Sequence, residues 1–215
     1  MDNKITGNKT AFYYEQYMNP AMVRLFRLMG LSSVAQEASG CMITDQDGKE
    51  YIDCLGGYGV FSLGHRHPRV MEAVTLQLNK MPLSSKILFD ESTGQLAAIL
   101  STITPGDLQY SFFGNSGAEA VEGALKLARA YTGRKKVIAT VNSFHGKTMG
   151  ALSATGRNLF RDPFEPLLAG FVHVPFGITD AVENVIDTDT AAVIVEPIQG
   201  EGGIIVPPDD YLPAL

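Results

Sequence analysis

The stretch Gly114–Ala118 has the residue types of an anion-binding site. Ser116 and Glu119 have the S-x-x-E spacing of a capping box, which predicts that a helix begins at Ser116. Backbone N–H groups in the first turn of a helix lack partners within the helix, and the helix dipole is positive at that end. The stretch therefore predicts either a binding site for an anion, most often a phosphate, or a plain capped helix after a strand.

Two further loops combine glycines with polar side chains, Asn142–Thr148 and Glu196–Gly203. Each of the three loops follows a run of apolar or β-branched residues that predicts a strand: Leu108–Phe113, Lys136–Val141 and Ala191–Val195. In open α/β sheets, ligands bind outside the carboxyl ends of the strands. The three loops therefore predict one shared site.

The motifs of nucleotide-binding proteins are incomplete in this sequence. Gly146-Lys147-Thr148 is similar to the end of a P-loop, but Val141 stands where that motif needs its first glycine. The glycines at 114 and 117 do not form the G-x-G-x-x-G pattern of dinucleotide-binding folds. The sequence therefore favours a small phosphorylated cofactor over a nucleotide.

The elements that position these loops alternate between strand and helix. Helical patterns cover Arg69–Asn79, Thr93–Ile103, Ser116–Gly133 and Asp180–Ile186, and a further strand is expected over Gly170–Phe176. This alternation predicts an α/β protein with a largely parallel sheet.

The N-terminal part of the chain has a different pattern. Residues 41–55 predict a β-hairpin whose turn runs through Asp45–Gly48. A calcium loop of the EF-hand type is disfavoured there, because Ile43 stands where an oxygen ligand is required. Residues 1–40 contain an aromatic cluster and suit a helical arm, which would pack either on the body of the protein or on a partner subunit.

The composition is that of a soluble globular protein with room for a substantial core. The chain has 215 residues, of which 45% are hydrophobic and 19% charged, and its net charge of -6 disfavours a nucleic-acid partner. No apolar stretch reaches the length of a membrane span, and the polar N-terminus disfavours a signal peptide. The two cysteines, Cys41 and Cys54, match no metal or redox spacing, which favours a cytoplasmic protein without a metal site.

Three motifs occur in compatible order and spacing: NSGAEA at 115–120, FHGKT at 144–148 and VEPIQGEGG at 195–203. Together they resemble the class III (ω-amino) aminotransferases, which are pyridoxal-phosphate enzymes of fold type I. The resemblance runs from about Gly40 to the last residue. Within the family, the segments around Asp53–Gly59 and Pro175–Gly177 look most like putrescine aminotransferases.

The resemblance implies an incomplete fold-type I large domain, with a mostly parallel sheet and helices on both faces. It divides the chain into an N-terminal arm and hairpin segment over residues 1–55 and the first part of the cofactor-binding domain over residues 56–215. The second half of that domain and a small C-terminal domain are expected to lie outside this chain. A complete member of the family is expected to be a homodimer.

The resemblance also implies contacts to the cofactor, pyridoxal 5′-phosphate, from all three loops. The residues are Ser116, Gly117, Ala118, Phe144, His145, Glu196 and Gln199. The helix start would hold the phosphate, and the Phe144 ring would stack on the flat cofactor ring. Substrate contacts are implied for Tyr58, Lys147 and Glu201, with Glu201 paired to an arginine from the second half of the family fold.

Lys147 departs from many members of the family. Acetylornithine, ornithine and 4-aminobutyrate members commonly have arginine there, which grips a substrate carboxylate with two hydrogen bonds, whereas lysine supplies only a point charge. Putrescine-type members resemble this chain in having lysine. The expected donor is therefore a primary amine, with putrescine favoured over ornithine, acetylornithine and 4-aminobutyrate, and the expected acceptor is 2-oxoglutarate.

The catalytic residues of the family are expected beyond Glu201. These are the lysine that forms the Schiff base with the cofactor and the acidic partner of the cofactor's ring nitrogen, and no lysine of this chain takes that position. The chain is therefore interpreted as the first half of an aminotransferase that is inactive alone. The alternative from another class is a non-catalytic interaction module that keeps the dimer surface of the family.

Overall fold

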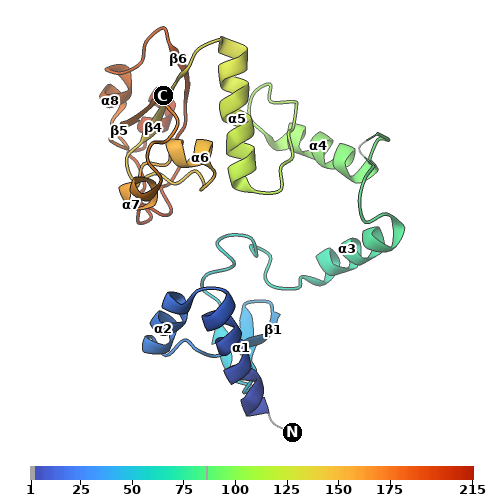
Figure 1. The fold of residues 1–215 in the computed structure, drawn as a ribbon. Helices are drawn as coiled ribbons and strands as arrows, with labels where there is room; N and C mark the ends of the chain where they lie inside the picture. Colours follow the sequence, from blue (N-terminus) through green and yellow to red (C-terminus); the bar gives the residue numbers. More distant parts are fainter. Residues whose placement is uncertain (1–2, 86) are drawn as a thin grey trace. The chain divides into compact units, whose positions relative to one another are not determined.

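The computed structural model describes residues 3–85 and 87–215. The contacts within the chain divide it into two compact units, Met1–Glu91 and Ser92–Leu215. Figure 1 shows the elements of both units, and each unit is described separately. The domain boundary expected after residue 55 refers to the complete family fold and stays a prediction.

The N-terminal unit begins with two helices that contact each other, α1 (Asn3–Tyr17) and α2 (Pro20–Leu28). Helix α2 begins where the Asn19 side chain accepts hydrogen bonds from two backbone N–H groups of its first turn. Arg27 of α2 forms an ion pair with Glu15 of α1, with 3.1 Å between nitrogen and oxygen. The arm expected in the first 40 residues is thus helical as far as Leu28.

A three-stranded antiparallel sheet follows, formed by β1 (Ala35–Ser39), β2 (Met42–Asp45) and β3 (Glu50–Ile52) in that order. Strands β2 and β3 confirm the predicted hairpin. Strand β3 ends at Ile52, before the predicted limit at Leu55, because the Asp53 carboxylate accepts hydrogen bonds from the next backbone N–H groups and begins a turn. Strand β1 was not predicted.

The hairpin turn is closed by one side chain. Asp45 Oδ1 accepts hydrogen bonds from the backbone N–H groups of Asp47 and Lys49, each at 2.9 Å, and its Oδ2 accepts the Tyr51 hydroxyl at 2.9 Å. An aspartate that bonds to backbone groups two and four residues ahead is typical of a turn. This confirms the turn that the sequence predicted at Asp45–Gly48.

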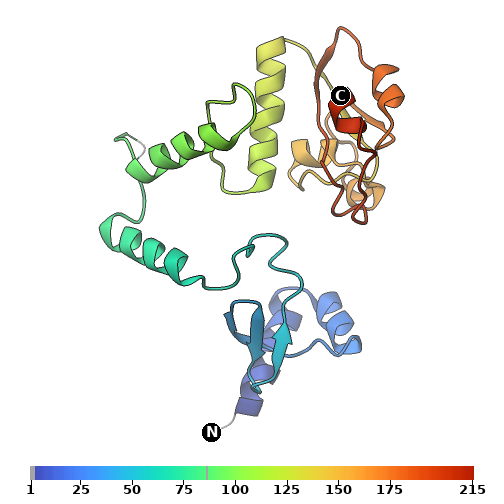
Figure 2. The ribbon, with the colours of Figure 1, turned by 180° about the vertical axis from the view of Figure 1, so that it is seen from behind.

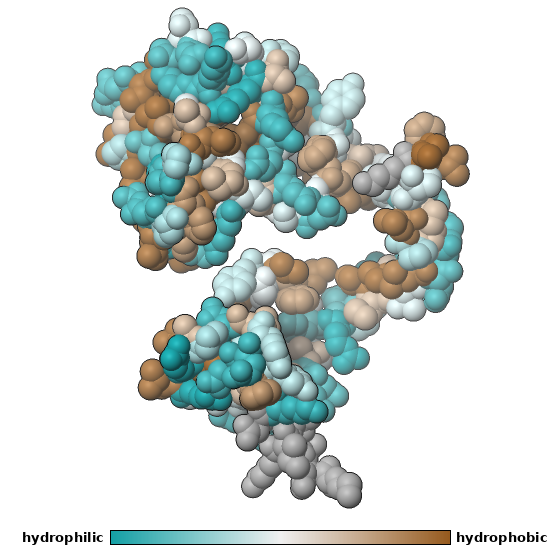
Figure 3. Space-filling view, in the orientation of Figure 1, coloured by the Kyte–Doolittle hydropathy of each residue, from teal (hydrophilic) through white to brown (hydrophobic). Residues whose placement is uncertain are grey.

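The loop that carries Tyr58 is closed by His65. The backbone of His65 exchanges two hydrogen bonds with Gly40, and its Nε2 lies 2.7 Å from a carboxylate oxygen of Asp53. Tyr58 projects from this loop with a φ of 57° and an exposed fraction of 87%. Helix α3 (Pro68–Lys80) begins after the loop and confirms the helix predicted there; it has no buried residue, and Figure 3 shows apolar side chains at the surface over it.

In the C-terminal unit, α5 (Gly117–Thr132) confirms the predicted helix after Gly114. Ser116 Oγ accepts a hydrogen bond from the backbone N–H of Glu119 at 3.2 Å. The Glu119 carboxylate accepts one from the N–H of Asn115 at 2.6 Å, one residue before the position of an ideal capping box. The helix ends at Gly133, whose φ of 69° is favourable for glycine.

The second sheet is parallel and has the order β5-β4-β6, with β4 (Lys136–Thr140) between β5 (Phe171–Val174) and β6 (Thr190–Val193). Ile138 of β4 packs with Val174 and with Val182 of the helix α8 (Thr179–Glu183). Figures 1 and 2 show α8 and α5 on opposite sides of this sheet. The parallel sheet with helices on both faces confirms the predicted α/β class.

The remaining elements of the chain are short, apart from α4. They are α4 (Glu91–Ile103), α6 (Met149–Ala154), α7 (Asn158–Arg161), the 3₁₀ helix η1 (Asp162–Phe164), α8 (Thr179–Glu183) and α9 (Tyr211–Ala214). Helix α4 confirms the predicted helix at Thr93–Ile103, and α8 is shorter than the predicted Asp180–Ile186.

Two strand predictions need correction. Leu108–Phe113 does not form a strand and is exposed throughout, because no strand among the described residues lies beside it to share backbone hydrogen bonds. The run Ala191–Val195 contributes its first three residues to β6, which ends at Val193, and the strand is not fully buried because Val193 is 36% exposed. Among the described residues, strand β6 lies at an edge of the sheet and has β4 as its one neighbouring strand.

Gly156 provides a test of how tightly the end of β4 is packed. A Cβ atom at this position would lie 2.0 Å from the carbonyl oxygen of Thr140, a distance that no side chain can keep. We expect Gly156→Ala to lower the free energy of unfolding by about 1–3 kcal/mol, measured by urea denaturation followed by circular dichroism.

Gly94, inside α4, is the matched control, because nothing lies within 4 Å of a Cβ placed there. We expect Gly94→Ala to raise the free energy of unfolding by about 0.5–1 kcal/mol, since alanine is the better helix former. Equal effects of the two substitutions would contradict the close packing at Gly156.

Candidate functional site

The loop after β4 meets the start of α5 at Gly146. A Cβ at this glycine would lie 2.8 Å from the Cβ of Ala118 and 2.9 Å from that of Ala151. Its φ of 132° also lies in a region that favours glycine. Only glycine therefore allows this close approach, which brings the first two predicted loops together.

Glu196 connects the second loop with the third. Its Oε2 accepts a hydrogen bond from the backbone N–H of Phe144 at 3.1 Å, and its Oε1 accepts one from Gly200 at 3.3 Å. Each carboxylate oxygen therefore holds one loop. The acidic side chain lies where β6 ends, at the same end of the parallel sheet as the loop that follows β4.

Gln199 forms a second connection, from a position that is only 1% exposed. Its Nε2 donates to Thr140 Oγ1 at 3.1 Å and to the carbonyl oxygen of Val141 at 2.8 Å, while its backbone pairs with Ile205. Its Oε1 is buried and has no partner among the described residues. The side chain that was predicted to line the cofactor site is thus anchored to the end of β4.

The start of α5 keeps the features of an anion site. Ser116 and Gly117 are exposed and Ala118 is half-buried. The backbone N–H groups of Gly117 and Ala118 have no acceptor in the described part of the chain, and Ser116 Oγ accepts from the N–H of Glu119 instead. Free N–H groups, the positive end of the helix dipole and a glycine without a side chain fit a phosphate group.

His145 lies next to Phe144 in a largely buried position. Its backbone N–H donates to Thr155 Oγ1 at 3.0 Å, while its Nε2 is buried without a partner among the described groups. Burial lowers the pKa of His145 to about 4, and the positive charge that His173 would carry when protonated adds to the effect. His145 is therefore neutral at neutral pH.

His173 is also held in its neutral form. Its Nε2 lies 3.1 Å from the carbonyl oxygen of Ala154, which can only accept a hydrogen bond, so the proton lies on Nε2. Its Nδ1 then accepts from Arg161 Nη1 at 3.3 Å. Burial, followed by the charge of Arg161, lowers the pKa of His173. His145 in the Phe144 loop and His173 in β5 are thus both neutral at neutral pH.

The predicted substrate residues Lys147 and Glu201 have partners within the C-terminal unit. Lys147 Nζ lies 5.9 Å from the centroid of the Phe144 ring. The Glu201 carboxylate forms an ion pair with Arg157 Nη1 at 3.3 Å, and that nitrogen also donates to the backbone oxygen of Glu201 at 2.6 Å. Glu201 therefore has an arginine partner already inside this chain, which the sequence did not predict.

Glu122 is another residue that the sequence did not single out. From α5, its Oε1 accepts hydrogen bonds from Thr148 Oγ1 at 2.7 Å, from the N–H of Gly150 at 2.9 Å and from that of Ala151 at 3.3 Å. A carboxylate is favourable at the start of a helix, here α6. No local motif could reveal it, because its partners lie at least 26 residues away in the sequence.

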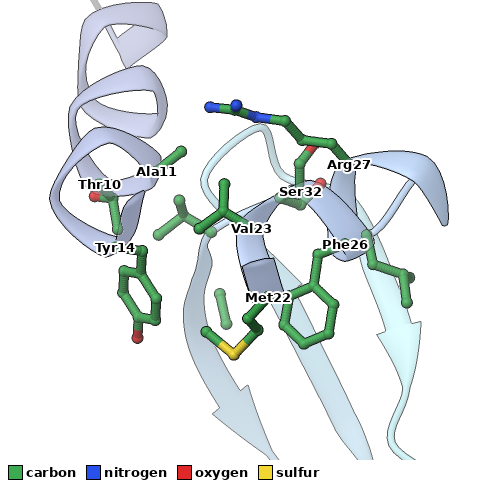
Figure 4. Close-up of a pocket in the computed structure, with 12 residues that line it drawn as sticks. Thr10, Ala11, Tyr14, Met22, Val23, Phe26, Arg27 and Ser32 are labelled. Atoms are coloured by element: carbon green, nitrogen blue, oxygen red, sulfur yellow. The ribbon is translucent and has the colours of Figure 1, made fainter. Parts of the chain in front are cut away.

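Tyr58 belongs to the N-terminal unit, so its predicted contact with substrate stays a prediction. The same unit contains a separate cavity of about 310 Å³ between α1, α2 and the start of β1. Figure 4 shows its mainly apolar wall, with Ala11 and Tyr14 from α1 and Met22, Val23 and Phe26 from α2.

Across residues 3–85 and 87–215, no helix is long and apolar enough to cross a membrane. The same residues contain no cluster of histidine, cysteine and acidic side chains suited to a metal ion.

The sequence matches the class III aminotransferase family over residues 29–215. It is 49% identical over 216 aligned residues to a putrescine aminotransferase from Pectobacterium atrosepticum, in an alignment that covers 94% of this chain and 46% of the relative. The chain thus spans about half the length of this curated relative.

Solved structures of transaminases have the same fold. An (S)-enantioselective ω-transaminase from Thermomicrobium roseum gives a TM-score of 0.86 at 31% identity, over 95% of this chain and 52% of the other. An ornithine aminotransferase from Toxoplasma gondii ME49 gives a TM-score of 0.79 at 30% identity, over 91% of this chain and 49% of the other.

The burial of His145 predicts a pH dependence of stability. The unfolded chain protonates this residue near its ordinary pKa of 6.5, whereas the folded protein does so only near 4. Protons therefore favour the unfolded state between these two pH values. The contribution of neutral His145 to the free energy of unfolding is complete above pH 6.5 and is lost progressively towards pH 4.

We expect His145→Gln to reduce the loss of stability between pH 6.5 and pH 4, as measured by urea unfolding at a series of pH values. The carboxylates are the same in both proteins, so their titration cancels in the difference. Parallel curves for the two proteins would show that His145 does not carry this dependence.

Proposed function

Because the chain belongs to the class III aminotransferase family, we propose that the protein containing it transfers an amino group from a primary amine to a 2-oxo acid. Enzymes of this family depend on pyridoxal 5′-phosphate. The observation that supports the proposal best is that the three loops lie together. Gly146 brings the loop after β4 against the start of α5, where N–H groups are free, and Glu196 joins the same loop to the loop after β6.

In this proposal the start of α5 binds the cofactor phosphate. Ser116 supplies its hydroxyl, and Gly117 and Ala118 supply backbone N–H groups that have no other acceptor in the described chain. When bound, the cofactor supplies the electron sink that activates the bonds at the amine-bearing carbon. The protein's contribution is to hold and orient that group.

The loop after β4 would hold the cofactor ring. Phe144 offers an aromatic surface, and the Glu196 carboxylate fixes the backbone of Phe144 at 3.1 Å. Neutral His145 adds no charge behind the ring, because burial keeps its pKa near 4. Gln199 would act from its anchored position at the end of β4.

Tyr58, Lys147 and Glu201 are assigned to the substrate. The Lys147 ammonium would attract a carboxylate of the 2-oxo acid acceptor and would repel the far ammonium group of a diamine. A diamine would therefore extend away from Lys147. The ion pair between Glu201 and Arg157 would have to open before Glu201 could contact a charged substrate.

The favoured donor is putrescine and the favoured acceptor is 2-oxoglutarate. The relative that is 49% identical is a putrescine aminotransferase, and Lys147 agrees with the resemblance to that group. Ornithine is the second candidate donor, because an ornithine aminotransferase is 30% identical and has the same fold. A homodimer in the cytoplasm is the assembly and location that we propose for the complete protein.

We expect the complete protein to transfer the amino group of putrescine to 2-oxoglutarate with a higher kcat/KM than that of ornithine or acetylornithine. Lysine at position 147 lacks the two-pronged grip that arginine has on a donor carboxylate. Glutamate formation with each donor gives the measurement. A preference for either amino acid would contradict the assignment of Lys147.

The 215-residue chain alone should show no turnover of putrescine with 2-oxoglutarate. The resemblance places the covalent lysine beyond Glu201, so this chain would supply the phosphate site without the catalytic amine. The same glutamate assay, run with added pyridoxal 5′-phosphate, tests this expectation. Robust turnover would show that the missing groups are present in the chain after all.

A further inference from the structure

Phe160 contacts two predicted site residues, although no sequence motif marks it. Its ring meets that of Phe144 edge-on, with 5.7 Å between centroids and 73° between planes. The Nζ atom of Lys147 lies 5.2 Å from the Phe160 centroid. Arg157, the partner of Glu201, places its guanidinium carbon 5.1 Å from the same ring. Phe160 thus lies where the aromatic and charged groups of the site meet.

The rings are the partners that hold Lys147. Its ammonium makes no ion pair or hydrogen bond with any group in residues 3–85 and 87–215, but it lies over the rings of both Phe160 and Phe144. An ammonium is attracted to the electron-rich face of an aromatic ring. A lysine side chain has a flexible four-carbon stem, so it would sample many positions without such a surface.

A cavity of about 370 Å³ opens at this place. Its lining residues are Lys147, Met149, Leu152, Leu159, Phe160 and Phe164. Lys147 is the one charged residue in this lining, and the other walls are apolar. An apolar wall lowers the local dielectric constant, so the charge of Lys147 acts more strongly on a group that enters.

We infer that Phe160 is the positioning residue for Lys147, and that it thereby sets the affinity of the site for a 2-oxo acid with a second, remote carboxylate. The position of Lys147 follows from the contacts alone. The role in substrate affinity rests on the proposed function. Phe160 is half-buried in helix α7, and Lys147 lies in the loop before α6, so Phe160 can fix the ammonium from a separate element.

The first experiment tests the position of Lys147 without any activity. Lysine amines of the chain are labelled with ¹³C-methyl groups, and the Lys147 signal is identified by its loss in Lys147→Arg. Methyl groups over an aromatic face give an upfield-shifted NMR signal. We expect Phe160→Leu to reduce this upfield shift, because only the Phe144 ring then remains beside the ammonium, and Phe160→Tyr to keep it. Unchanged signals from other lysines report an intact fold.

Phe164→Leu is the matched control, because Phe164 lines the same cavity but has no ring or cation contact among the described residues. Its substitution should leave the Lys147 signal in place. An unmoved signal in Phe160→Leu, or an equal displacement in Phe164→Leu, overturns the positioning role.

The second experiment measures steady-state kinetics in the complete transaminase. We expect Phe160→Leu to raise the KM for 2-oxoglutarate about two- to fivefold relative to that for pyruvate, which lacks the remote carboxylate, with kcat unchanged. Phe160→Tyr and Phe164→Leu should keep the wild-type ratio.

The two experiments separate the two ways in which the idea can fail. A normal KM ratio together with a displaced NMR signal overturns the role in substrate affinity and keeps the positioning role. An inactive wild-type enzyme overturns the proposed function and, with it, the substrate part of the inference. The NMR result still decides whether Phe160 positions Lys147.

Discussion

The approach of the loop after β4 to the start of α5 is the constraint on which the candidate site depends. Gly146 leaves no room for a side chain against Ala118 and Ala151. Glu122 reinforces the same contact from α5 by accepting three hydrogen bonds from the start of α6 and its neighbour Thr148. The free N–H groups and the Phe144 loop keep their relative positions because both the close packing at Gly146 and the hydrogen bonds to Glu122 hold them.

The charges around the Phe144 loop are arranged asymmetrically. On the buried side, two histidines are neutral, since burial lowers the pKa of both His145 and His173. On the open side, Lys147 is charged and is held by aromatic rings instead of an acid. Glu196 contributes a negative charge, but backbone N–H groups occupy both of its oxygens. The free charge of this loop is therefore the ammonium.

Local chemistry explains which features the sequence predicted. The Ser116 cap, the end of α5 at Gly133 and the buried strand β4 depend on residues that are neighbours in the chain. The pairing of Arg157 with Glu201 joins residues 44 positions apart, so no local pattern reports it. For the same reason, the sequence could place the second and third loops after the strands β4 and β6, but it could not show that Gly146 brings the second loop into contact with the start of α5.

The wrong prediction of a strand at Leu108–Phe113 has a physical origin of the same kind. Its alternating apolar pattern is that of a strand, yet a strand exists only where a neighbour shares its backbone hydrogen bonds. The segment has no regular secondary structure, with the Phe112 ring close to Gly123 of α5 and the Tyr110 side chain 98% exposed.

An exposed, apolar segment without a neighbouring strand can serve as a template for edge-to-edge association. Any form of the protein that leaves Leu108–Phe113 uncovered is therefore prone to self-association through this segment, and its solubility will depend on what covers it. A charged residue in place of Tyr110 would act as a gatekeeper against such aggregation, since the side chain at this position has little packing to lose.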